Sequence, residues 1–163
     1  MDLSFSKRIS TQSPAGRFVI LWLPVILWWA ALTVGTSIPG EDLPRPPFRH
    51  SDLLAHVGLY GVLGFLLYRA IVLGTRLGKV RWAWLAVFAI VQLYGILDEI
   101  HQLWIPGRFC ELYDALADGL GGFAGVVACL VGMVWQQGSA AAKESSPPDA
   151  DQVPDPPPPR RPD

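Results

Sequence analysis

Four apolar runs constrain the fold of this chain more than any other feature. Residues 18–36 contain no charged side chain, residues 53–73 contain one histidine and one arginine, and residues 115–135 contain one aspartate. The fourth run, residues 82–97, is shorter, but its helix can begin at Val80 and continue to Leu103. About 20 apolar residues in a helix cross about 30 Å of hydrocarbon. We therefore predict an all-α polytopic membrane protein, built as a four-transmembrane-helix bundle.

Basic residues gather at one set of predicted helix ends, which gives the bundle an orientation. Cytoplasmic loops of membrane proteins carry an excess of lysine and arginine. This places both termini and residues 76–81 in the cytoplasm, and residues 38–52 and 98–113 outside. A cleaved signal peptide is the alternative for the first run. We favour a retained helix because the run is long and rich in tryptophan, and because its loss would spoil the charge pattern.

Composition divides the chain into three parts. Residues 1–17 are predicted to be a short cytoplasmic lead, and residues 18–135 the membrane domain. Residues 136–163 are low in complexity and rich in proline, so they are predicted to form a disordered cytoplasmic tail. The loop at residues 38–51 contains several prolines and is predicted to be extended, and Pro106-Gly107 is predicted to end the third helix.

Polar side chains recur at helical spacing near one end of three of the runs. Residues three or four apart share a helix face. The aligned residues are Asp52, His56 and Tyr60 in the second run, Gln92, Glu99 and Gln102 with Asp98 beside them in the third, and Asp114 and Asp118 in the fourth. Gly121 and Gly125 continue the last face, and a glycine face packs on protein. The two aspartates are therefore expected to point into the bundle.

Two readings of this polar layer remain open. The groups can simply lock the loop between the third and fourth helices, or they can form a binding site. Arg108 is the expected partner of Glu99, Asp114 or Asp118, because its planar fork can bind a carboxylate through two hydrogen bonds. His56 is expected to hydrogen-bond Asp52 or Tyr60. The acid and histidine spacings match no established metal signature, so neither a metal nor a cofactor is predicted.

The order of these residues resembles the VanZ-like family of small bacterial membrane proteins. The resemblance lies in Glu99-x-x-Gln102, then Pro106-Gly107-Arg108, then Asp114-x-x-x-Asp118, with Asp52-x-x-x-His56-x-x-x-Tyr60 as a second-helix element. It implies that the function depends on five residues: His56, Glu99, Gln102, Arg108 and Asp114. One departure is Asp118, where the family pattern usually has asparagine. The resemblance also implies a role in the bacterial cell envelope, since the founding member is associated with resistance to the glycopeptide teicoplanin.

These features favour a protein of the bacterial cytoplasmic membrane whose outer polar pocket binds an envelope lipid, a cell-wall precursor or a glycopeptide-type drug. The alternative is an intramembrane enzyme that acts on a lipid-linked substrate, with Glu99 or Asp114 as acid or base and Arg108 holding an anion. A transporter ranks last because the polar residues do not continue toward the cytoplasm. No nucleotide fingerprint or nucleic-acid partner is indicated. A homo-oligomer stays open, since the glycine face can pack within one chain or between copies.

Overall fold

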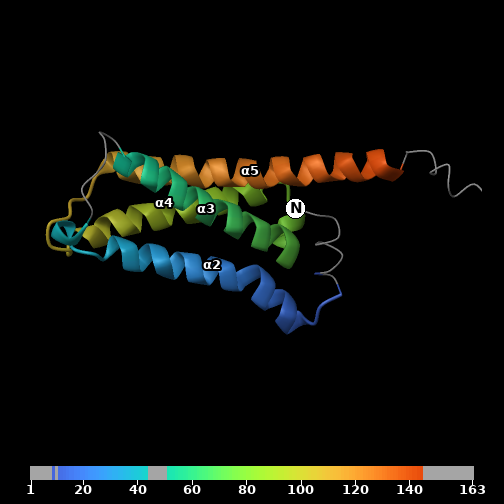
Figure 1. Ribbon diagram of the computed structural model, residues 1–163, viewed down its shortest axis with the longest axis horizontal. Coiled ribbons are helices and arrows are strands. Elements are labelled where there is room, and N and C mark those ends of the chain that lie inside the picture. Colours follow the sequence, from blue (N-terminus) through green and yellow to red (C-terminus); the bar gives the residue numbers. More distant parts are fainter. Residues whose placement is uncertain (1–8, 10, 44–50, 145–163) are drawn as a thin grey trace, which may run out of the picture.

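Four long helices lie side by side in the computed structural model, which describes residue 9 and residues 11–43 and 51–144 (Figure 1). The elements are α2 (Pro14–Thr36), the 3-10 helix η1 (Gly40–Asp42), α3 (Ser51–Gly74), the 3-10 helix η2 (Leu77–Lys79), α4 (Ala83–Gln102) and α5 (Leu112–Glu144). No strand occurs in these described ranges. All four long helices have the length and apolar composition needed to cross a membrane. The predicted all-α bundle is confirmed.

The outer surface of the bundle is apolar, as a lipid-facing surface must be. In the most apolar stretch of each helix, only 17% to 44% of the residues are buried inside the protein. Large aliphatic side chains such as Leu27, Val34 and Val131 are more than half exposed. In water such a surface would be strongly unfavourable, whereas in a bilayer these side chains contact acyl chains.

The start of α2 is capped by its own residues and held against the end of α3. Pro14 occupies the first turn of α2, where its missing N–H is tolerated, and the Ser13 hydroxyl accepts a hydrogen bond from the Gly16 N–H at 3.2 Å. Arg17 donates to the Leu73 carbonyl oxygen at 3.0 Å, which joins the start of α2 to the end of α3. The start of α2 and the end of α5 lie at the same end of the bundle (Figure 1). The side of the membrane on which they lie stays a prediction.

The glycine face of α5 packs on α3 within the same chain. A Cβ atom at Gly121 would overlap the Val57 carbonyl oxygen of α3, and one at Gly125 would overlap the Gly61 carbonyl oxygen. The two backbones can approach this closely only because both glycines lack side chains. The face is therefore occupied by α3 and is not available to a second copy.

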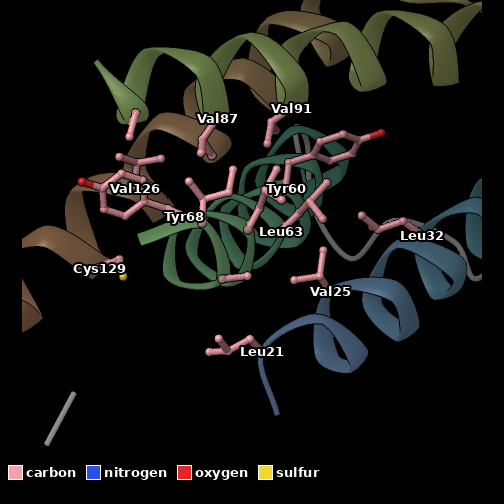
Figure 2. Packing of buried hydrophobic residues seen from close by; sticks show 14 of the residues in the cluster. Leu21, Val25, Leu32, Tyr60, Leu63, Tyr68, Val87, Val91, Val126 and Cys129 are labelled. Carbon is pink, nitrogen blue, oxygen red and sulfur yellow. The ribbon is translucent and has the colours of Figure 1, made fainter. Parts of the chain in front are cut away.

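Below the polar layer, the buried side chains of all four helices meet in one core (Figure 2). Leu63, Val87 and Val91 are fully enclosed, and Val126 is 1% exposed. Because α3 lies between the other helices, it supplies the largest share of this core. The core holds the helix ends in a fixed register, and the polar side chains at those ends depend on that register.

The observed elements differ from the predictions in three places. Helix α2 begins at Pro14, inside the lead predicted for residues 1–17. Helix α5 continues to Glu144, whereas the tail was predicted to start at residue 136. Alanines at 140–142 favour helix and the first proline after α5 is Pro147, so nothing stops the helix at the end of the apolar run. The loop after α2 contains η1, a short helical turn in a segment predicted to be extended. Residues 44–50 and 145–163 lie outside the described part of the chain.

Candidate functional site

His56 of α3 reaches across to the acidic side chains of α5. Its Nδ1 atom lies 2.8 Å from Oδ1 of Asp118, and its Nε2 atom lies 3.8 Å from Oδ2 of Asp114. The prediction of a hydrogen bond to Asp52 or Tyr60 was therefore wrong. Those residues lie one turn away on the same helix, whereas the close approach of α5 at Gly121 places Asp118 directly opposite the imidazole. The Tyr60 ring instead lies parallel to the His56 ring, with the two centroids 6.2 Å apart.

Asp118 is the most deeply buried acidic side chain of the site. It is fully enclosed, and it lies against Gly95 of α4, where any side chain would occupy its space. Among the described residues its Oδ2 atom has no hydrogen-bond partner, and the same holds for Oδ1 of Asp114 one turn earlier. Buried polar atoms normally have a partner in a finished site. Two acceptor atoms at the junction of α3, α4 and α5 are thus left unused by the protein itself.

Glu99 of α4 connects the site to the start of α5. It is 1% exposed, and its Oε2 atom accepts a hydrogen bond at 2.8 Å from the Glu111 N–H, immediately before α5. Its Oε1 atom accepts a hydrogen bond from Nε2 of Gln102 at 3.0 Å. The first N–H groups of a helix have no partner within that helix, so a carboxylate there is stabilising. Glu99 therefore has a structural role in addition to its place beside His56 and Asp118.

Asp98 belongs to a second polar group, formed by three helices. The Thr36 hydroxyl of α2 donates to Oδ1 of Asp98 at 2.7 Å, and the Tyr60 hydroxyl of α3 donates to Oδ2 at 3.1 Å. Asp98 is 3% exposed, so these donors stabilise it in place of water. Sequence reasoning missed Thr36. Its signal was a hydroxyl at the last position of a run that contains only one other hydroxyl, that of Thr33.

Arg108 does not form the ion pair that was predicted for it. Within the described residues it makes no salt bridge, and its Nε atom donates to the Ile38 carbonyl oxygen at 3.3 Å. The turn explains this direction, because Gly107 has a positive φ of 71° and the Gly40 N–H donates to the Pro106 carbonyl oxygen at 2.9 Å. These features direct Arg108 to the end of α2. Its charge still acts on Asp114 through space.

The nine side chains predicted for the site are thus separated into three groups. His56, Glu99, Asp114 and Asp118 form one cluster, hereafter the His56 cluster, and Gln102 joins it through Glu99. Asp98 and Tyr60 form the second group with Thr36. Arg108 and the exposed Asp52 lie at the margin, and Asp52 makes no hydrogen bond to the described residues, although its charge acts on Asp114. Every group lies at the end of the bundle where α2 ends and α5 begins.

Comparison with known proteins assigns the chain to a family. A family model described as VanZ/LLP1 matches residues 9–135. The chain belongs to the VanZ/LLP1 family. No curated protein and no solved structure gives a significant match. The matched range of this VanZ/LLP1 chain contains all three polar groups and ends within α5, before the helical extension to Glu144.

Two hollows on the surface of this VanZ/LLP1 protein lie away from the polar groups. One, of about 680 Å³, runs along the apolar face of α5 between Phe123 and Trp135. The other, of about 350 Å³, lies between the start of α2 and Gly74 at the end of α3. The first is almost entirely apolar and belongs to the surface that lipid covers. The polar chemistry is concentrated instead at the opposite end, in the His56 cluster.

Proposed function

We propose that this VanZ/LLP1 protein resides in the bacterial cytoplasmic membrane and binds the anionic headgroup of an envelope lipid or a lipid-linked cell-wall precursor. The binding surface is the end of the bundle that carries the three polar groups, which the charge pattern predicts to face outward. Its flanks are apolar helices that acyl chains contact, so a ligand with a long hydrocarbon tail fits both surfaces at once.

The observation that carries this proposal is that Arg108 has unused hydrogen-bond donors. Only its Nε atom is engaged, and among the described residues its two terminal nitrogens have no hydrogen-bond acceptor. The side chain is half-buried in the turn between α4 and α5, outside the apolar helices, which is where the proposal places the lipid headgroup. A guanidinium fork matches the oxygens of a phosphate and binds two of them together. Arg108 thus offers an unused anion-binding surface beside the buried polar layer.

The test measures headgroup binding in nanodiscs made of a zwitterionic lipid. Short-chain phosphatidylglycerol and a short-chain polyprenyl diphosphate are titrated separately, which distinguishes an ordinary phospholipid from a lipid-linked precursor. Arg108→Ala is expected to weaken binding of the preferred ligand by about tenfold or more, since hydrogen bonds to charged groups are strong. Arg108→Lys should retain part of the affinity. Arg76→Ala, an exposed arginine at the far end, is the matched control.

Equal binding by wild type and Arg108→Ala would overturn the proposal. A glycopeptide-type drug is the other ligand of this class, and it is tested by comparing teicoplanin susceptibility of cells that express wild type or Arg108→Ala. A change in susceptibility with unchanged lipid binding would move the proposal to the drug.

One observation favours a second function, an intramembrane enzyme acting on a lipid-linked substrate. A histidine whose Nδ1 atom is hydrogen-bonded to a buried carboxylate has the arrangement of an oriented general base. Glu99 or Asp114 would then act as the acid. Product formation in proteoliposomes that is abolished in His56→Gln and Glu99→Gln, while lipid binding persists, would establish catalysis over simple binding.

A further inference from the structure

Acidic side chains in the His56 cluster outnumber the basic groups that touch them. Glu99 and Asp118 are fully buried, and the Asp114 side chain is 13% exposed. The one basic side chain within ion-pair distance, among the described residues, is His56. Buried charges are normally paired with an opposite charge or bound to a metal. A single imidazole is too little positive charge for three carboxylates.

The hydrogen bonds already present account for only part of the cluster. The bond from His56 engages Oδ1 of Asp118, and capping of α5 together with Gln102 engages both oxygens of Glu99. These hydrogen bonds would be sufficient if the cluster only stabilised the fold. However, Oδ2 of the fully enclosed Asp118 finds no partner in the described part of the chain, and it faces Gly95 on the helix that carries Glu99. The unused oxygen therefore lies against α4, the helix that carries Glu99 one turn after Gly95.

The geometry of the cluster matches the spacing of metal ligands. His56, Glu99 and Asp118 each offer one donor atom, and these three atoms lie within 4.8 Å of one another. Ligands bound at about 2.0 to 2.2 Å from a metal ion are separated from each other by about 3 to 4 Å. The distance of 2.8 Å between His56 Nδ1 and Asp118 Oδ1 lies just below this range and the limit of 4.8 Å lies just above it, so a bound ion requires only small shifts of these side chains. Three helices deliver these ligands, so no spacing in the sequence reveals them.

We propose that His56, Glu99 and Asp118, with Asp114 beside them, bind one divalent transition-metal ion such as Zn²⁺ or Mn²⁺. An imidazole nitrogen combined with carboxylate oxygens suits these ions, whereas Ca²⁺ and Mg²⁺ prefer oxygen ligands alone. The two positive charges of the ion offset most of the negative charge of the three carboxylates. The ion also places a second positive charge near Arg108, where it can face the phosphate of a bound headgroup, and this last step alone rests on the proposed function.

The test uses the full-length protein in detergent after treatment with a chelator. Zn²⁺, Mn²⁺ and Mg²⁺ are titrated by calorimetry, and one Zn²⁺ or Mn²⁺ per chain is expected, with Mg²⁺ weaker. Asp118→Asn and Glu99→Gln keep the size of each side chain and should each weaken binding by about tenfold or more. Glu41→Gln, at an exposed acid of η1 at the same end, should bind like wild type. X-ray absorption of the wild-type complex should show one imidazole among oxygen ligands, a result that does not depend on whether any variant folds.

No binding of Zn²⁺ or Mn²⁺ by wild type, equal binding by Asp118→Asn, or a spectrum without imidazole would each overturn the metal site. The headgroup titration, run on the same preparations with and without chelator, separates the two proposals. Headgroup binding that depends on Arg108 but survives the loss of all metal binding leaves the proposed function standing without the metal. If one metal ion binds but no headgroup does, the metal site stands and the proposed headgroup function fails.

Discussion

Asp118 of α5 lies directly over Gly95 of α4. A Cβ atom placed on Gly95 would come within 2.7 Å of Oδ2 and 2.8 Å of Cβ of Asp118. No real side chain tolerates such contacts, so the space above Gly95 is reserved for this carboxylate. The position of the buried acid is thus determined by a missing side chain on the neighbouring helix.

Gly95→Ala is therefore expected to separate α4 from α5 at the site. The added methyl group meets a side chain that is itself enclosed, and overpacking of this kind destabilises by about 1–3 kcal/mol. Thermal unfolding in detergent measures the effect. Gly58→Ala is the matched control, because nothing lies within 4 Å of its added Cβ and alanine favours helix. An equal change in both variants would mean that the contact with Asp118 is unimportant.

Tyr60→Phe should destabilise the second polar group. The substitution removes the hydroxyl that donates to Oδ2 of buried Asp98 and leaves that oxygen without its donor. A buried acceptor without a partner costs about 1–3 kcal/mol, which a thermal unfolding series resolves. Tyr113→Phe, at a side chain that is 73% exposed, should leave stability unchanged. Similar stability of the two variants would show that Asp98 does not depend on Tyr60.

Gly107→Ala should disturb the direction of Arg108. The left-handed conformation at φ 71° costs a residue with a side chain about 1–2 kcal/mol. If the turn relaxes, Arg108 loses its contact with Ile38, and the variant should lose headgroup affinity in the same nanodisc titration as Arg108→Ala. Gly138→Ala, which has open space around its added Cβ, provides the control. Full affinity in Gly107→Ala would indicate that the turn does not position the arginine.

The predicted orientation can be tested by thiol labelling. Cys110 is exposed in the turn before α5, and Cys129 is buried in the core. A membrane-impermeant maleimide added to spheroplasts should label the wild type, and Cys110→Ser should abolish the labelling while Cys129→Ser retains it. Labelling that appears only after lysis would reverse the orientation and place the polar groups on the cytoplasmic side.

The helices were predictable from the sequence because long apolar runs have few structures available to them in a membrane. The helix from Ala83 to Gln102 shows this, since both of its ends fall inside the range expected from its apolar run and its flanks. Helix α5 shows the limit: its apolar run ends at residue 135 but the helix continues to Glu144, because an apolar run determines where lipid contact ends and not where the helix ends. The helix-favouring alanines at 140–142 extend α5 beyond the apolar run.

The sequence predicted which residues belong to the site much better than it predicted which of them hydrogen-bond to each other. His56 and Asp118 were both expected near the same end, yet their hydrogen bond depends on how closely α5 approaches α3, which spacing along one helix does not reveal. Arg108 was assigned a carboxylate partner from its charge and from the planar fork of its guanidinium group. Its observed direction follows from a left-handed turn and from the carbonyl oxygen of Ile38, which no charge pattern contains.

Helix α5 is longer than the membrane that it crosses. Its 33 residues extend for about 50 Å, whereas the hydrocarbon layer is about 30 Å thick and usual tilts shorten a helix only slightly. Because the polar groups hold its first turn near one surface, the surplus emerges at the other. The last turns of α5 therefore continue as helix beyond the hydrocarbon layer, and Glu144 lies clear of the acyl chains.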